Sequence, residues 1–111
     1  MRFATTGDPK FVANCHCRAC RRATGAAFST WVGFTDDKAR WLTRAPSFFE
    51  SSPGVSRGYC AECGTPLTYA SNKWPGEIHF LIGVFDRPDQ FTPMGDAFAE
   101  EGLEWAPRVA K

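Results

Sequence analysis

The chain has 111 residues, 43% of them hydrophobic and ten of them phenylalanine, which is enough for one ordinary core and too few for two. Thirteen Lys and Arg against twelve Asp and Glu give a formal net charge of +1 without a basic block, which disfavours a nucleic-acid groove or an anionic membrane. The sequence has neither a signal-peptide pattern nor an 18-residue apolar run. We therefore expect residues 1–111 to form a single cytoplasmic domain that acts on a small partner, with no membrane and no nucleic acid.

The first half of the chain is predicted to contain one short helix and two strands. The stretch CRACRRATG favours a helical turn that Gly25 ends at its C-terminal side. Residues 27–34, AFSTWVGF, alternate in the manner of a strand. After a turn at 35–37, the segment 38–43, KARWLT, is expected to form a short strand that can close a hairpin.

The second half is predicted to add further short strands. Residues 44–56 carry two prolines, a glycine and four serines, which indicates a surface connection with an aromatic anchor. The segments 55–60 and 65–70 are strand-like, and the most apolar run, 77–85, is expected to be the central strand. Residues 91–111 show no clear periodicity. The pattern predicts a mainly β fold of short antiparallel strands in two packed sheets.

Three of the five cysteines lie within six residues, in NCHCRAC. In an extended segment residues i and i+2 point to the same side, so Cys15 and Cys17 can face one ion while His16 points away. The turn from Cys17 to Cys20 brings a third sulfur to the same place. Because close cysteines in a reducing compartment are more often metal ligands than disulfides, the triplet indicates a zinc site whose fourth corner is open to water or substrate.

A second cysteine pair, Cys60 and Cys63 in CAEC, is half of a zinc knuckle and is followed by Gly64. Two arrangements follow from five cysteines. In one, a single zinc takes four of them as a closed structural site. In the other, the triplet binds an open zinc and the pair is left free, disulfide-linked or completed by other ligands.

Three segments in order, CHCRACRRATGAAFSTWVGF, YCAECGTPLTY and IGVFDRPDQFTP, resemble the glutathione-dependent formaldehyde-activating enzyme family, the domain also named for centromere protein V. The resemblance covers about residues 3–105 and implies an Mss4-like fold. It also implies that Cys15, Cys17 and Cys20 hold the catalytic zinc.

The chain departs from the family pattern at two places. The resemblance implies that Cys60 and Cys63 hold a structural zinc together with an N-terminal Cys-x-Cys strand, which the family has before the segment matching RFATTGDP and which this chain lacks, so the second site is incomplete. The family also tends to have a histidine a few residues after the proline matching Pro93, where this chain has Asp96. The role of that histidine is thereby placed in question.

The resemblance implies Zn²⁺ as cofactor and glutathione as co-substrate. A zinc with three thiolates and one labile position suits a thiol held as thiolate, the nucleophile that adds to formaldehyde. We therefore expect a carbon–sulfur lyase of the S-(hydroxymethyl)glutathione synthase type, whose partners are a small thiol and a small aldehyde. The alternative is a non-catalytic, zinc-stabilised Mss4-like binding module.

Charged side chains beside the triplet complete the candidate site. Arg18, Arg21 and Arg22 can offset the cluster charge, and Arg21 and Arg22 are our candidates for binding the carboxylates of the thiol substrate. Solvated surface arginines are the alternative. His16 is expected to be a supporting or surface group rather than a ligand, and His79, inside the apolar run, a satisfied core or edge histidine.

Overall fold

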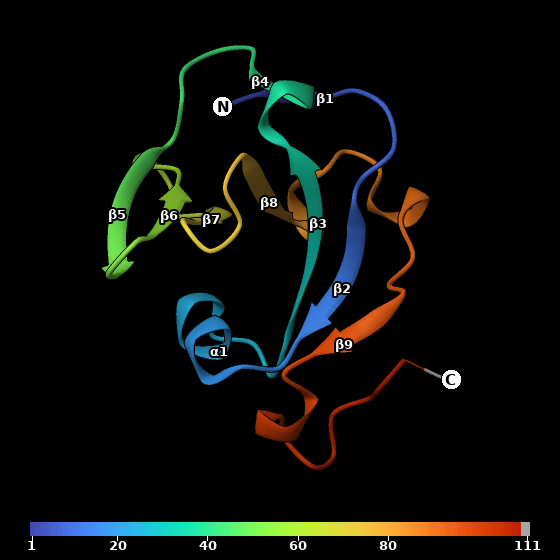
Figure 1. Cartoon of the computed structure of the whole chain (residues 1–111). Coiled ribbons are helices and arrows are strands. Elements are labelled where there is room, and N and C mark those ends of the chain that lie inside the picture. The colour runs from blue at the N-terminus through green and yellow to red at the C-terminus, as the bar shows by residue number, and fades with distance from the viewer. Residues whose placement is uncertain (110–111) are drawn as a thin grey trace. The chain divides into compact units, whose positions relative to one another are not determined.

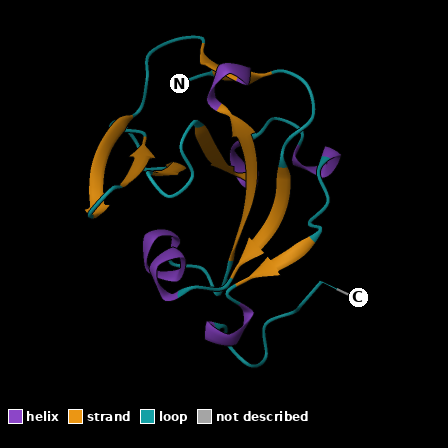
Figure 2. Cartoon of the chain, in the orientation of Figure 1, coloured by secondary structure: helices purple, strands orange, loops and turns teal. Residues whose placement is uncertain are grey.

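The computed structural model describes residues 1–109, which form mainly short strands (Figure 1). Within this range there are nine strands, one seven-residue α-helix and four single-turn 3-10 helices. Figure 2 shows that strands make up more of the chain than helices do. The expected mainly β fold class is confirmed. In the described range, no helix is long and apolar enough to cross a membrane.

The chain divides into two compact units, each built from two stretches of sequence. The first contains Met1–Lys10 and Gly33–Phe80, and the second contains Phe11–Val32 and the chain from Leu81 onward. Strand β3 (Ser29–Thr35) passes from the second unit into the first. That residues 1–111 form a single domain stays a prediction.

Strand pairing in the first unit is antiparallel. Strand β1 (Phe3–Thr5) pairs with β4 (Ala39–Trp41). Four more strands follow one another in sheet order: β5 (Ser47–Ser52), β6 (Val55–Tyr59), β7 (Pro66–Ser71) and β8 (Glu77–Leu81). The core of this unit forms around Phe80, which is fully buried. The Phe80 ring stacks on Phe3 at 4.4 Å between centroids and meets Phe34 edge to face at 6.4 Å.

Three strand predictions need correction. Strand β4 pairs with β1 instead of closing a hairpin with β3, because the 3-10 turn η1 (Asp36–Lys38) redirects the chain between them. Residues 47–52 were expected to be an irregular connection, but they form β5. Pairing with β6 provides partners for their backbone N–H and C=O groups, and this outweighs the low strand propensity of the serines. The run 77–85 stays extended only to Leu81, and η2 (Ile82–Val84), with Gly83 at its centre, follows.

The second unit is organised by a parallel strand pair, which differs from the antiparallel pairing that we expected. Strand β2 (Phe11–Cys15) lies between β3 and β9 (Gly95–Ala97). In the β2–β9 register Asn14 faces Asp96, and the two strands run side by side in Figure 1. Two 3-10 turns, η3 (Pro88–Gln90) and η4 (Ala99–Glu101), flank β9. A segment without clear periodicity is thus brought next to the first cysteine.

The helix α1 (Arg18–Thr24) follows β2 after only two residues. Cys17 is its N-cap, and Gly25 ends it in the left-handed conformation (φ 73°), as the sequence predicts. The Gly25 N–H donates to the Arg21 carbonyl at 2.8 Å. This abrupt change from strand to helix gathers the three neighbouring cysteines.

Candidate metal centre

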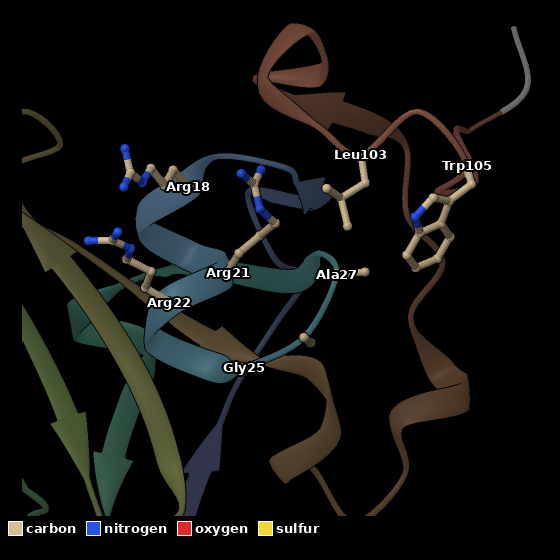
Figure 3. A pocket seen from close by; sticks show the side chains of 8 residues that line it. Arg18, Arg21, Arg22, Gly25, Ala27, Leu103 and Trp105 are labelled. Atoms are coloured by element: carbon tan, nitrogen blue, oxygen red, sulfur yellow. The ribbon is translucent and has the colours of Figure 1, made fainter.

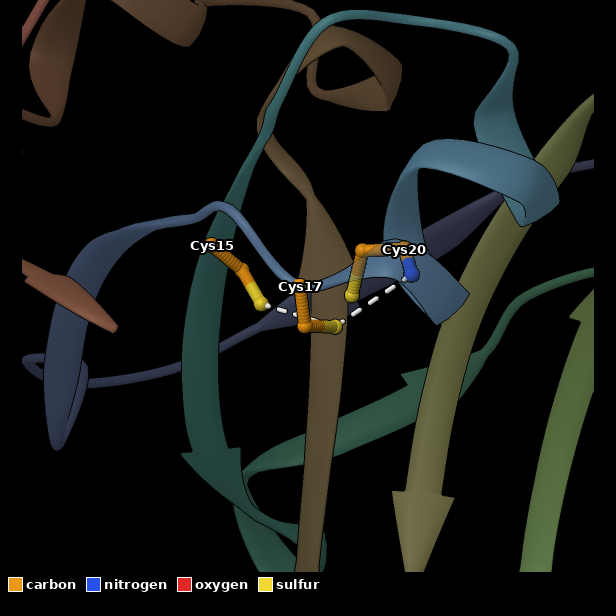
Figure 4. A group of neighbouring side chains, drawn as sticks. All are labelled: Cys15, Cys17 and Cys20. Carbon is orange, nitrogen blue, oxygen red and sulfur yellow. Dashed lines mark hydrogen bonds between the residues drawn. The ribbon is translucent and has the colours of Figure 1, made fainter. Parts of the chain in front are cut away.

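The three cysteines of NCHCRAC converge where β2 meets α1 (Figure 4). All three Sγ atoms lie within 4.8 Å of one another, and those of Cys15 and Cys17 are 3.4 Å apart. The Cys20 backbone N–H donates to the Cys17 Sγ at 3.3 Å, so that sulfur also caps the helix. Cys15 and Cys20 are buried, whereas Cys17 is partly exposed. The structure therefore brings together the triplet that the sequence singled out.

The spacing and chemistry of these sulfurs fit a tetrahedral metal ion. Zn–S bonds of about 2.3 Å place two thiolates about 3.8 Å apart, which is close to the 3.4 Å between the Cys15 and Cys17 sulfurs and within the 4.8 Å that bounds the cluster. The pKa of Cys15 is raised, chiefly by its hydrogen bond with Cys20 and also by burial, and burial raises the pKa of Cys17. The raised pKa values favour neutral thiols, so a bound cation would be needed to hold these close sulfurs as thiolates, and soft thiolates suit Zn²⁺.

His16, between two of these cysteines, lies outside the sulfur cluster. Its side chain is fully buried, and its Nε2 lies 2.8 Å from the Asp96 Oδ1. The ring stacks on Phe28 with 5.3 Å between centroids. The His16 backbone N–H donates to the Ala97 carbonyl at 3.0 Å and so extends the β2–β9 pairing. His16 is thus a buried supporting group, as the alternation of side chains predicted, and not a surface group.

Asp96 is a residue whose role sequence reasoning missed. Its carboxylate is 6% exposed, and its second oxygen accepts the Val109 backbone N–H at 2.8 Å. The hydrogen bond with His16 holds the pKa of Asp96 below its usual range. The contact between His16 and Asp96 follows from the parallel pairing of β2 with β9. The residues around position 96 do not indicate that pairing, so the sequence could not predict the contact.

The other face of His16 is closely packed. In residues 1–109 the buried Nδ1 has no hydrogen-bond partner. A Cβ added to Gly102 would lie 2.9 Å from the His16 Cβ and 3.0 Å from its Nδ1, so only glycine fits there.

The Arg21 Nη1 donates to two carbonyls, those of His16 (2.6 Å) and Glu101 (2.8 Å). Arg21 therefore connects α1 both to the residue between Cys15 and Cys17 and to η4.

The helix α1 and the segment after η4 line an open hollow of about 520 Å³ (Figure 3). We call it the arginine pocket; it is lined by Arg18, Arg21, Arg22, Gly25, Ala26, Ala27, Leu103 and Trp105. In Figure 3, Arg18 and Arg22 extend from one side of the helix and Arg21 from the side nearer Leu103. All three arginines that neighbour the triplet in sequence are therefore among the residues that line this hollow, although their side chains extend from different sides of α1.

The second cysteine pair lies in the first unit, in the turn between β6 and β7. The Gly64 N–H donates to the Cys60 carbonyl at 2.7 Å, and Gly64 takes the left-handed conformation. The exposed Cys63 Sγ lies 3.0 Å from the Thr65 Oγ1, and this contact lowers the pKa of Cys63 to about 7. Among the described residues the pair belongs to no group of three metal-binding side chains. Its place in a second zinc site stays a prediction.

The other histidine, His79 in β8, is satisfied within the first unit, as expected. It is 8% exposed, its Nε2 lies 2.9 Å from the Glu77 Oε1, and its ring stacks on Tyr69 at 5.4 Å between centroids. It is a core histidine with partners, so it adds nothing to the candidate site.

Comparison with known proteins gives one family and a fold neighbour. Residues 1–101 match the family described as "Glutathione-dependent formaldehyde-activating enzyme". Among solved structures, the crystal structure of a Rhodobacter sphaeroides protein has a TM-score of 0.58 and 13% sequence identity, covering 83% of this chain and 97% of that one. At that identity the likeness concerns the fold alone. The comparison with curated protein sequences gives no match.

Proposed function

The chain belongs to the glutathione-dependent formaldehyde-activating enzyme family, and from this premise we propose that it binds a small thiol such as glutathione and forms or cleaves the adduct of that thiol with a small aldehyde such as formaldehyde. One observation in the structure supports the proposal in addition to family membership. The sulfur atoms of Cys15, Cys17 and Cys20 lie within 4.8 Å of one another. Three protein ligands are typical of a zinc site that keeps a position for substrate.

The reaction needs a thiol in its nucleophilic form. A zinc ion held by the three cysteines would supply it, by lowering the pKa of a thiol bound at the remaining position. The thiolate sulfur adds to the carbonyl carbon, a C–S bond forms, and the carbonyl oxygen takes up the proton that the thiol released. The product is an S-hydroxymethyl adduct, and the reverse reaction breaks the same bond.

The residues around the cysteines support this chemistry by holding the cluster in place. The hydrogen bond between His16 and Asp96 fixes the segment between Cys15 and Cys17. Arg21 holds the carbonyl of the same segment from the helix side. A cluster positioned by buried partners loses little freedom on binding, which favours tight metal binding. We propose that the neighbouring arginines orient the substrate through its carboxylates.

The test combines a spectroscopic and a kinetic measurement. Cobalt-substituted protein should change its sulfur-to-metal charge-transfer band on addition of glutathione. Exchange between formaldehyde, glutathione and the adduct, followed by NMR, should be faster than the uncatalysed background, which is appreciable because thiols add to formaldehyde spontaneously.

The decisive control is Cys20→Ala, which removes one sulfur of the cluster. It should lose the spectral response and return the exchange rate to background, while Cys63→Ala, with its side chain in the first unit, should keep both. If wild type and Cys20→Ala both match the background and cobalt does not respond to the thiol, the enzyme proposal is wrong. A non-catalytic zinc-stabilised binding module then takes its place.

A further inference from the structure

The connection between β6 and β7 holds two thiols in one tight turn. The Cys60 N–H donates to the Thr65 carbonyl at 2.9 Å, and the Gly64 N–H donates to the Cys60 carbonyl at 2.7 Å. The second bond spans four residues, as in a single turn of α-helix. In such a turn residues three apart share one face, with their Cβ atoms about 5–6 Å apart. The side chains of Cys60 and Cys63 therefore lie on the same side of the turn.

This arrangement is close to the one that a disulfide needs. A turn keeps the Cα atoms of residues three apart within about 7 Å, and a disulfide joins Cα atoms over nearly the same distance. Residues 61–65 are all exposed, and Gly64 has a left-handed backbone. The turn can therefore make the small adjustment that brings the two sulfurs into bonding distance without disturbing β6 or β7.

The two thiols are also each other's natural partners. Both are free thiols, and the first unit contains no other cysteine, since the remaining three belong to the second unit: Cys15, Cys17 and Cys20. In the part of the chain that the structure describes, no third metal-binding side chain joins the pair. Two sulfurs are only half of the ligands of a closed zinc site. The chemistry that suits this pair is therefore the exchange of a thiol pair with a disulfide.

The two thiols differ in their access to solvent. Cys63 is exposed, whereas Cys60 is partly buried. The Cys63 Sγ lies 3.0 Å from the Thr65 Oγ1, and a hydroxyl that donates to this sulfur stabilises the thiolate, the nucleophile in thiol–disulfide exchange. The negative charge of Glu62, inside the turn, is offset by an ion pair with Arg44. Cys63 is thus placed to attack first, and Cys60 to complete the reaction.

We propose that Cys60 and Cys63 form a redox-active dithiol that reduces small disulfides. The Cys63 thiolate attacks one sulfur of the small disulfide, a mixed disulfide forms, and the other half leaves and takes up a proton. Cys60 loses its proton and attacks the Cys63 sulfur, and the second half leaves in the same way. The protein thus gives up two electrons and two protons and gains an internal disulfide, while one small disulfide becomes two small thiols.

The exchange is reversible and separate from the metal centre. A disulfide that closes so short a loop removes little chain entropy, and an exposed disulfide is easily reduced, so an excess of small thiol should reverse both steps. The pair is therefore suited to cycling and not to permanent stabilisation. The reaction uses no metal ion, so this inference goes beyond the proposed function and does not rest on it.

The experiment follows one tryptic peptide of the full chain. Reduced, zinc-loaded protein is equilibrated with mixtures of oxidised and reduced glutathione, quenched with acid, alkylated with iodoacetamide and digested. Cleavage after Arg57 and Lys73 releases a peptide, residues 58–73, that contains Cys60 and Cys63 and none of the other cysteines. Two alkyl groups on this peptide report the dithiol, and the loss of two hydrogen atoms without alkylation reports the disulfide.

The disulfide form of the peptide should increase with the proportion of oxidised glutathione and disappear when reduced glutathione is restored. Because the turn holds the two thiols together, the native protein should be half-oxidised at about tenfold less oxidised glutathione than the protein unfolded in urea. Equal values for the two states would show that the folded turn contributes nothing, and the inference would be wrong.

Variants separate the roles of the two cysteines. Cys60→Ser should stop at the mixed disulfide, with one glutathione on Cys63, and Cys63→Ser should react more slowly because the remaining thiol is partly buried. Thr65→Val should slow the first step about tenfold, the effect of one hydrogen bond to a charged group. The matched control is Thr92→Val, an exposed threonine of the second unit, which should react as the wild type does.

Four results would overturn the inference. The peptide could keep both thiols in oxidised glutathione alone, the wild type could stop at the mixed disulfide as Cys60→Ser does, or the protein could form disulfide-linked dimers. A second zinc ion that protects the peptide from alkylation would replace the dithiol by a metal site. Cys20→Ala, which removes a sulfur of the metal centre, should oxidise the peptide as the wild type does, so loss of formaldehyde exchange in that variant concerns the proposed function alone.

Discussion

The Nε2 of His16 lies 2.8 Å from the Oδ1 of Asp96, and this contact joins residues 80 positions apart in the sequence. Both side chains are shielded from water, with exposures of 0% and 6%. One end of the contact lies between two of the clustered cysteines, and the other lies on β9. The pair therefore links the candidate metal centre to the C-terminal part of the second unit.

Replacement of Asp96 should weaken metal binding as well as stability. Asp96→Ala leaves the His16 Nε2 and the Val109 N–H without their acceptor, so the segment between the cysteines loses its support. We expect about tenfold weaker zinc binding, as for other groups that position metal ligands, and a lower Tm. Asp96→Asn has a single carbonyl oxygen that can keep one of the two hydrogen bonds, so its zinc affinity and Tm should lie between those of the wild type and Asp96→Ala. Zinc competition with a chromophoric chelator measures the first effect.

The control for Asp96 is Asp89→Ala, an exposed carboxylate in η3 of the same unit. It should leave both zinc affinity and Tm unchanged. Wild-type zinc affinity in Asp96→Ala would show that the His16–Asp96 contact plays no part in positioning the cysteines.

Gly102→Ala should destabilise the protein by about 1–3 kcal/mol, the usual cost of overpacking. The new methyl group would meet the His16 Cβ at 2.9 Å and the Arg108 Nη2 at 2.8 Å. The flexible Arg108 can move aside, whereas His16 is held by Asp96 and cannot. Gly95→Ala is the matched control, because nothing lies within 4 Å of its added Cβ. Equal urea midpoints for the two variants would contradict the packing argument.

The metal content should be about one tightly bound zinc per chain, held by the cysteine triplet. Cys17→Ser removes the sulfur that both joins the cluster and caps α1, so the purified variant should contain little zinc by elemental analysis. Cys63→Ser should keep the tightly bound zinc. Two zinc ions per chain at full occupancy would show that further ligands complete the second site.

The acid sensitivity of the first unit should depend partly on Glu77. The Lys10 Nζ at 2.6 Å, and then the His79 Nε2 at 2.9 Å, lower the pKa of this carboxylate. Because its pKa is lower in the folded than in the unfolded chain, the carboxylate stabilises the fold above the unfolded value of about 4.3. That contribution is lost as the pH falls through the lower, folded pKa.

Glu77→Gln should therefore be less stable than wild type at pH 7, and the difference should shrink below about pH 4 as the wild-type carboxylate becomes protonated. Urea unfolding of both proteins over a pH series measures it. Glu104→Gln, at an exposed position, should follow the wild type throughout. A difference between Glu77→Gln and wild type that is constant from pH 7 to pH 3 would show that ionisation of Glu77 plays no part.

The sequence by itself determined the features that depend on neighbouring residues. The alternation of an extended chain places Cys15 and Cys17 on one side, and the following turn brings Cys20 to them. Gly25 ends α1 because its left-handed conformation suits glycine. Short strands separated by Gly and Pro were enough to predict the mainly β fold, since these residues act locally.

Only the tertiary structure decided the features that depend on strand register. Nothing around position 96 indicates that Asp96 meets His16, because their contact follows from the parallel pairing of β2 with β9. One contact of Arg21 has the same origin: besides the nearby His16 carbonyl, its guanidinium donates to the carbonyl of Glu101, which lies in η4 after β9. Three arginines in one short motif look alike in sequence, and one of the two carbonyls that distinguish Arg21 belongs to a residue 80 positions away.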